Sequence, residues 1–263
     1  IYTRRTPDYM LSNAQDFRKG RMGYQQHPWT ASLGDKAVIF TTNPASTEYD
    51  NRPNRWAGNL TLPRSVQHEN VLLCLYRIEP DFVDYLYSHI YFPKHEMDEV
   101  VEKDGWIFGR KGNGYVAVYS LLPGYWEKKD PAMFKALYAD NWQEMYDRAE
   151  DYEYIAQGHA NVWAVEMGSK AENGSFEAFV KGFEGKKVTG DTHNLVYQSP
   201  SQGEITFGWN KPLTVKGEEI CIHGYKRYDN EFSQTEFDAG KIEVNAGGHK
   251  TILNFEKAER TDI

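Results

Sequence analysis

The chain has 263 residues, of which 40% are hydrophobic and 26% are charged, the balance of a globular protein with material for a sizeable core. Its net charge of −8 argues against a nucleic-acid-binding protein of the usual basic kind, and no apolar run is long enough to cross a membrane. The aromatic content of 14% suits β-strands and also sugar-binding surfaces, so composition alone does not choose between these uses.

The charge is unevenly distributed along the chain. Residues 1–64 contain nine Lys or Arg against five Asp or Glu, a surplus of +4, so the remaining residues carry −12. A positive segment in an acidic protein is suited to an anionic substrate; the alternative is an ordinary solvated mixture of charges. The chain opens on Ile1 without an initiator Met or a signal peptide. We therefore expect a mature product or an excised piece of a longer protein, with a secreted or periplasmic location as the working expectation.

Most of the sequence has the pattern of β-strands. β-Branched and aromatic residues concentrate in short runs separated by Gly, Pro, Asn and Asp, which predicts a mainly-β fold, a large antiparallel β-sandwich of supersandwich-like type with a few short helices. The predicted strands are KAVIFTT (36–42), NVLLCLYRI (70–78), DYLYSHIYF (84–92), the hairpin DGWIFGRKGNGYVAVYSL (104–121) and, from residue 194 onward, NLVYQS, GEITFGW, PLTVKG, EEICIHGYKRY, GKIEVNA and KTILNFEKA.

Helical spacing is limited to three segments. PKHEMDEVVEKDG (93–105) predicts one or two short amphipathic turns, and SFEAFVKGFEG (175–185) places its phenylalanines on one face, against the sheet. The segment at about 125–157 is predicted as a helical excursion from the β scaffold. Because the sequence has no internal repeat and no low-complexity linker, we predict a single domain over 1–263.

A run of polar side chains precedes the first long strand pattern. Residues 24–33 read YQQHPWTASL, so Tyr24, Gln26 and His27 stand directly before a strand that begins near Trp29. Strand alternation would place His27 beside Trp29 on one face. We identify His27 and Tyr24 as candidate catalytic residues and Gln26 and Trp29 as candidate substrate-binding residues. The alternative is a satisfied polar network at a strand end.

A second run of polar side chains precedes another predicted strand. LPRSVQHENVLLCLYRI (62–78) carries Arg64 and His68 ahead of a run that is apolar on both faces and therefore central in its sheet. If the two polar runs converge at one end of the sandwich, His27 and His68 supply an acid–base pair and Arg64 binds an anion. We therefore add His68 to the catalytic candidates and Arg64 to the substrate-binding ones; single-sequence topology leaves the convergence open.

A third candidate surface lies on DYLYSHIYF. Tyr85, Tyr87, His89 and Tyr91 share one face of this predicted strand, while the alternate residues form the core. Rings with polar tips are suited to stacking on sugars, so all four are candidate substrate-binding residues. The alternative is a cross-strand face that packs against a neighbouring layer.

Other chemistry has little support in the sequence. We interpret Cys74 and Cys221 as buried free thiols, although the sequence leaves a disulfide open. No Cys/His cluster has zinc spacing and no phosphate-binding motif is present, so we expect no metal and no cofactor. Carboxylate pairs for glycoside hydrolysis stay open because the separation they require is spatial.

Seven segments together resemble the β-sandwich portion of bacterial heparinase II/III-like proteins, in which an α/α toroid is followed by a large antiparallel sandwich. They are HPWTASLG, KAVIFTTNP, LPRSVQHENVLLCLYRI, HIYFPKHEMDEVV, GWIFGRKGNGYVAVYS, NVWAVEMG and SPSQGEITFGW. The resemblance extends from about Tyr9 to Phe255 without one diagnostic motif. It implies cleavage of acidic polysaccharides by β-elimination, in which a Tyr or His removes the C5 proton of a uronate.

The same family commonly places its main Tyr and His on the toroid, and this chain has no series of paired helices, so no catalytic residue is carried over by motif. The resemblance implies the sandwich domain of a polysaccharide lyase that binds an acidic polysaccharide or oligosaccharide and packs against a helical toroid. The alternatives are a non-catalytic glycan-binding or structural sandwich, and a glycoside hydrolase component. No nucleic-acid or membrane partner is expected.

Overall fold

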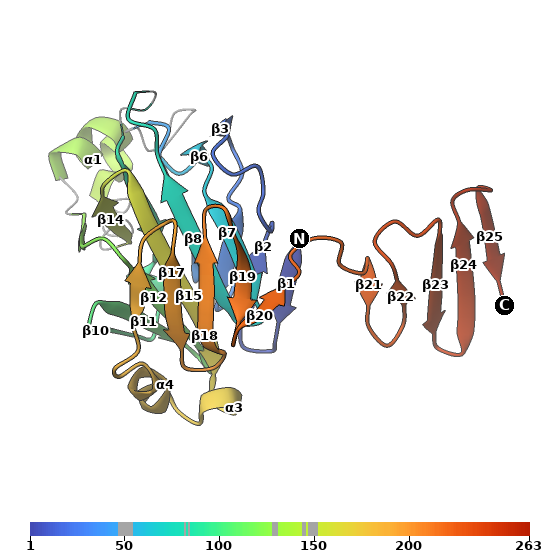
Figure 1. Cartoon of the computed structure of the whole chain (residues 1–263). Helices are drawn as coiled ribbons and strands as arrows, with labels where there is room; N and C mark the ends of the chain where they lie inside the picture. Colours follow the sequence, from blue (N-terminus) through green and yellow to red (C-terminus); the bar gives the residue numbers. More distant parts are fainter. Residues whose placement is uncertain (47–54, 82, 84, 128–130, 144–145, 147–151) are drawn as a thin grey trace. The chain divides into compact units, whose positions relative to one another are not determined.

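The computed structural model describes the chain except residues 47–54, 82, 84, 128–130, 144–145 and 147–151. It divides into two compact units, Ile1–Ile220 and Cys221–Ile263. Both consist mainly of antiparallel strands (Figure 1), which confirms the predicted mainly-β class. The sequence predicts a single domain instead, because it contains no linker. The boundary follows from strand pairing, since the described strands beyond Ile220 pair only among themselves.

The first sheet of the larger unit has seven strands, and its outer face bears the aromatic rings of β9. Their spatial order is β1 (Tyr2–Arg5), β2 (Met10–Asn13), β4 (Trp29–Ser32), β5 (Val38–Thr42), β9 (Tyr87–Tyr91), β14 (Glu153–Gln157) and β13 (Gly124–Trp126). A separate two-stranded ribbon pairs β3 (Met22–Tyr24) with β6 (Asn59–Thr61).

The second sheet has six strands and packs against the inner face of the first. Its order is β10 (Glu99–Lys103), β11 (Trp106–Lys111), β12 (Gly114–Ser120), β15 (Ala160–Ser169), β8 (Val71–Arg77) and β7 (Arg64–His68). Alternate residues of β8, such as Cys74 and Tyr76, meet Trp29 and Ile39 of the first sheet in one hydrophobic core. The predicted RKGNG turn joins β11 to β12, with Gly112 at a φ of +56°, a conformation that favours glycine.

A third sheet covers the other face of the second. It comprises β16 (Val188–Gly190), β17 (Leu195–Ser199), β18 (Gly203–Gly208), β19 (Lys211–Val215) and β20 (Glu218–Ile220). Tyr197 of β17 contacts the ring of Trp106 and donates a hydrogen bond to Glu166 of β15. The second sheet is therefore buried on both faces, which explains why β8 is apolar at successive positions.

The helices are short, and one predicted helix is largely a strand. In the described ranges they are η1 (Lys94–Glu96), α1 (Pro131–Tyr138), η2 (Ala139–Asn141), α3 (Lys170–Asn173) and α4 (Phe176–Gly182). As predicted, α4 lays Phe176, Phe179 and Phe183 on the second sheet, against Tyr115 and Phe108. Segment 93–105 forms η1 and then β10, because its valines pair with β11. The predicted excursion at 125–157 contains α1 and η2, but also strands β13 and β14.

The smaller unit has little to bury. It contains the pair β21 (Tyr228–Asp229) and β22 (Gln234–Thr235) and the three-stranded sheet β23 (Lys241–Ala246), β24 (His249–Asn254) and β25 (Glu259–Asp262). Phe232, Phe237 and Phe255 are exposed. Cys221, predicted to be buried, is exposed, whereas Cys74 is buried as predicted, and neither forms a disulfide. Within the described ranges, no helix is long and apolar enough to span a membrane.

Candidate functional site

The outer face of the seven-stranded sheet carries the row of rings predicted on β9. Tyr87, His89 and Tyr91 project from it together, with Tyr87 and His89 in edge contact at 5.9 Å between ring centroids. The strand register places Thr42 of β5 opposite His89, and Phe40 opposite Tyr91. Phe40 and Tyr91 are stacked with centroids 5.4 Å apart. The predicted shared face is therefore confirmed for these three residues.

The same face includes a buried ionic cluster that sequence reasoning missed. Glu153 of β14 is fully buried, and its Oε1 accepts hydrogen bonds from Arg55 Nε at 2.6 Å and from His89 Nδ1 at 2.7 Å. Trp56 lies flat on the His89 ring, with centroids 4.0 Å apart and planes within 5°. The other His89 nitrogen, Nε2, is bonded to the Thr42 hydroxyl. Arg55 and Glu153 are therefore buried as an ion pair. Neither charge could be buried without such a partner except at a large cost in free energy.

This cluster gives His89 a structural role. The carboxylate accepts from Nδ1, so Nδ1 carries the proton and both ring nitrogens are engaged. The sequence predicts His89 as a substrate-binding residue, but its side chain is 0% exposed and covered by Trp56. Direct contact with a substrate is therefore excluded in this conformation. His89 instead anchors β9 to Glu153.

His27 occupies a different environment, at the edge of the same face. The strand begins at Trp29, after Pro28, so the alternation does not extend back to His27. His27 stacks on Phe40 at 4.1 Å between centroids, and its Nε2 donates to the backbone carbonyl of Trp56 at 2.7 Å. Its Nδ1 is thus the acceptor nitrogen, and no protein partner for it occurs in the described part of the chain. Burial lowers the pKa of His27, although the Trp56 carbonyl opposes this effect.

Tyr87 is the second titratable group with an available polar tip. It is half-buried, and its hydroxyl has no hydrogen-bond partner within the described ranges. Burial raises the pKa of Tyr87 to about 12, while the positive charge of Arg55, whose guanidinium carbon lies 5.8 Å from the Tyr87 ring centre, opposes the rise. Tyr85 contacts Tyr87 edge-on at 6.2 Å. At neutral pH Tyr87 is therefore a proton donor.

Two other predicted site residues are structural. Trp29 was expected to bind substrate, but it is 1% exposed in the core and its indole N–H donates to the Thr41 hydroxyl at 2.9 Å. Arg64 was expected to bind an anion, but it is 6% exposed and pairs with Asp16 at 2.9 Å. Arg64 also donates to the carbonyl of Lys211 at 2.7 Å, so it fastens β7 to the third sheet.

The convergence of His27 and His68, which the sequence left open, does not occur. Residues 64–68 are strand β7 itself rather than a loop, because they pair directly with β8. Ser65, near the start of β7, bonds to Asn13, which is the register partner of Trp29 at the start of β4. His68 ends β7 and therefore lies toward the opposite end, in a different sheet from the strand that His27 precedes.

Gln26 and Tyr24, the remaining predicted site residues, belong to the polar run before strand β4. The side chain of Gln26 is exposed, and its backbone carbonyl accepts from Asn59 Nδ2 at 3.0 Å. Gln26 therefore stays available to a ligand. Tyr24 ends β3, and its side chain lies outside the described residues.

The missed residues had weak signals. Arg55 and Trp56 follow a segment without strand periodicity, and Glu153 lies in a stretch predicted to be helical. Only cross-strand pairing of β14 with β9 brings Glu153 to His89, and such pairing joins residues far apart in sequence. The strand-forming run YEYIA at residues 152–156 was the available clue to β14.

Unpaired cations gather at the end of the larger unit where β4 begins. Arg77 ends β8 there, and its guanidinium carbon lies 5.6 Å from the Trp209 ring centre. Lys19 Nζ lies 5.9 Å from the same ring and donates to the Trp209 carbonyl. Among the described residues, neither of these two cations forms an ion pair. We call Lys19 and Arg77 the cationic patch.

Comparisons with known proteins add no assignment. No protein-family model matches the sequence, and no curated protein matches it significantly. In the part of the chain that the structure describes, no group of three or more His, Cys, Asp and Glu side chains is arranged to hold a metal ion.

Proposed function

We propose that the chain is the β-sandwich part of a polysaccharide lyase that cleaves uronic-acid-containing glycans by β-elimination. The observation that carries the proposal is His27: its Nε2–H is donated to a carbonyl, leaving Nδ1 as an open acceptor. A lowered pKa keeps the ring neutral near pH 7, as a general base requires. The family resemblance of the sequence supports the same reaction class.

β-Elimination needs a base, an acid and neutralisation of a carboxylate. The base removes the C5 proton beside the uronate carboxyl group, the electron pair forms the C4–C5 double bond, and the C4–oxygen bond breaks. The departing glycosidic oxygen then takes a proton from the acid. Positive charge near the uronate carboxylate makes the C5 proton more acidic.

The roles follow from the environments of three features. Nδ1 of His27 accepts the C5 proton, and the Tyr87 hydroxyl, kept protonated by its raised pKa, supplies a proton to the leaving oxygen. The cationic patch attracts the acidic polymer toward this end of the sandwich. We further propose that a helical toroid, as in the resembling family, packs against the outer face and completes the cleft.

A non-catalytic glycan-binding sandwich is the second candidate. This candidate is favoured because three residues expected to contact substrate are instead buried and bonded within the fold: Trp29, Arg64 and His89. A glycoside hydrolase has less support, because Glu153 is buried and held by two donors and is therefore not a free acid or nucleophile.

The test incubates the longest natural polypeptide containing these residues with a panel of acidic polymers: alginate, pectate, hyaluronate and heparin. A lyase produces ultraviolet absorbance from the unsaturated uronate together with new reducing ends. Reducing ends without that absorbance would identify a hydrolase, and binding without cleavage would identify a binding domain. Either result, or silence with every polymer, would overturn the proposal.

A further inference from the structure

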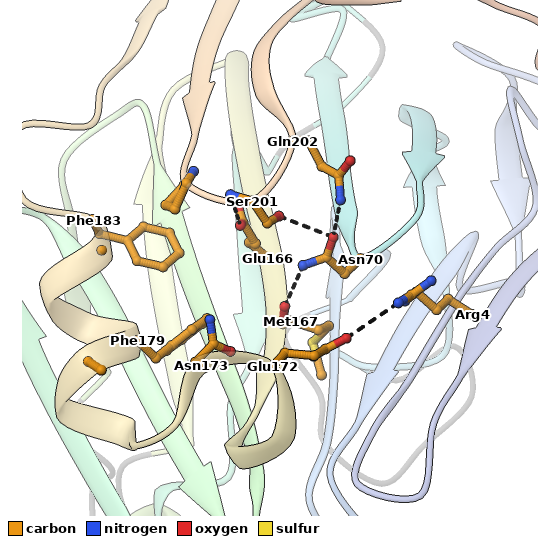
Figure 2. A pocket seen from close by; sticks show the side chains of 13 residues that line it. Arg4, Asn70, Glu166, Met167, Glu172, Asn173, Phe179, Phe183, Ser201 and Gln202 are labelled. Atoms are coloured by element: carbon orange, nitrogen blue, oxygen red, sulfur yellow. Dashed lines mark hydrogen bonds and ion pairs between the residues drawn. The ribbon is translucent and has the colours of Figure 1, made fainter.

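A half-open cavity of about 420 Å³ lies at the opposite end of the larger unit from His27. It opens where β15 ends, between helix α4 and the β17–β18 turn (Figure 2). In the register of the second sheet, Glu166 of this cavity pairs with Val71 at the start of β8, whereas Arg77 ends that strand. The size is that of sites for small organic ligands. Neither the proposed lyase reaction nor the buried Glu153 cluster involves this cavity.

The cavity has an apolar side and a polar side. Figure 2 shows Phe179 of α4 and Phe183, which follows α4 directly, on one side, and Asn70, Ser201 and Gln202 on the other. Ring edges beside convergent amides and hydroxyls are the combination that recognises a sugar, which has apolar C–H faces and a rim of hydroxyl groups.

Two amides in the lining are held at one end and open at the other. The Asn173 Oδ1 accepts from the backbone N–H of Ser169 at 3.1 Å, and the Gln202 NH2 group donates to Asn70 Oδ1 at 2.7 Å. In the described part of the chain, the Asn173 NH2 group and the Gln202 Oε1 have no partner. A preoriented donor and a preoriented acceptor thus remain for hydroxyl groups of a ligand.

The charges in the lining determine which sugars fit. Glu166 is fully buried and accepts from Tyr197 OH at 2.5 Å, Ser199 OH at 2.8 Å and Ser201 N–H at 3.1 Å, with no cation among its described neighbours. Glu172 is paired with Arg4 at 3.3 Å. Arg4, the guanidinium in the lining, is thus already paired, so a ligand carboxylate would find no free counterion here, which disfavours uronates and other anions.

We propose that this cavity binds a neutral sugar residue. The ligand class differs from the acidic polymer proposed for the other end, so this inference does not depend on the lyase reaction. A site of this kind would hold a neutral branch or chain end of a mixed glycan.

The test uses a substitution that fills the cavity without removing a hydrogen bond. A Cβ at Gly182, the last residue of α4, would lie 3.7 Å from Pro200, an ordinary contact, so Gly182→Leu projects into the cavity without backbone strain. Ala171→Leu on the exposed surface of α3 is the matched control. Binding of glucose, galactose, mannose, N-acetylglucosamine, glucosamine and glucuronate is measured by saturation-transfer NMR and titration.

We expect at least one neutral sugar to bind the wild type and the Ala171→Leu control equally. Gly182→Leu, with an unchanged or higher melting temperature, should weaken that binding by roughly tenfold or more, because the space is occupied. Absence of binding by every neutral sugar, unchanged binding to Gly182→Leu, or tighter binding of glucuronate or of the amine glucosamine than of their neutral counterparts would overturn the proposal.

Discussion

Glu153 and Glu166 are both buried in the larger unit, but their partners differ. Glu153 accepts from the cation Arg55 and from His89, whereas Glu166 accepts only from neutral hydroxyl and backbone groups. Accordingly, burial raises the pKa of Glu166 despite three hydrogen bonds. The comparison teaches that hydrogen bonds alone do not compensate a buried charge as fully as a cation does. It also separates a rigid anchor beside the proposed active site from a carboxylate that lines a cavity.

The largest expected effect comes from Glu153→Gln. The substitution removes the carboxylate that holds Arg55 and His89, so a buried positive charge loses its counterion, and we expect a loss of about 3–5 kcal/mol in the free energy of unfolding. Chemical denaturation followed by tryptophan fluorescence measures this. Glu184→Gln, on an exposed pair with Lys103, is the control and should change little. A loss below about 1 kcal/mol for Glu153→Gln would show that the cluster is not an anchor.

A smaller effect is expected for Glu166→Ala. Only neutral donors lose their acceptor, and the adjoining cavity admits water to replace it, so the loss should be about 1–3 kcal/mol. The same denaturation experiment at pH 7 compares the two variants directly. If Glu166→Ala destabilises as much as Glu153→Gln, the distinction between the two carboxylates is not supported.

The smallest effect is a dependence on pH. Because the pKa of Glu166 is raised in the folded state, the folded protein binds its proton more tightly than the unfolded chain. This contribution to stability is fully present below the ordinary Glu value of 4.5 and is lost as the pH rises through the raised value. Glu166→Gln should therefore flatten the stability profile above pH 4.5 relative to the wild type. Parallel profiles for the two proteins would contradict the assigned shift.

The sequence predicted local periodicity well and spatial neighbours poorly. Alternation on β9 correctly placed Tyr87 and His89 on one face, and helical spacing correctly placed Phe179 on the sheet. It did not reveal that Trp56, supplied by a distant segment, covers His89, since register and layer packing depend on long-range pairing.

The type of a polar residue also did not show whether it belongs to a binding site or only stabilises the fold. Arg64 and His27 both looked suited to ligand chemistry from the sequence, yet Arg64 is saturated by Asp16 and backbone carbonyls, whereas His27 keeps one nitrogen open. What distinguishes them is the number of partners each side chain finds in the fold, which spacing along the chain does not encode.

The most direct test of the proposed reaction compares the wild type, His27→Ala and His68→Ala in the natural polypeptide, with the initial rate of unsaturated uronate formation measured from pH 5 to 8. The structure places His68 away from the site, so His68→Ala should keep the wild-type rate. His27→Ala should lose about 10²- to 10⁴-fold, the usual contribution of a general base. Because burial lowers the pKa of His27, the acidic limb of the wild-type profile should have its midpoint below 6.5. A His27→Ala variant that keeps the wild-type rate and profile would contradict the assignment of His27 as the base.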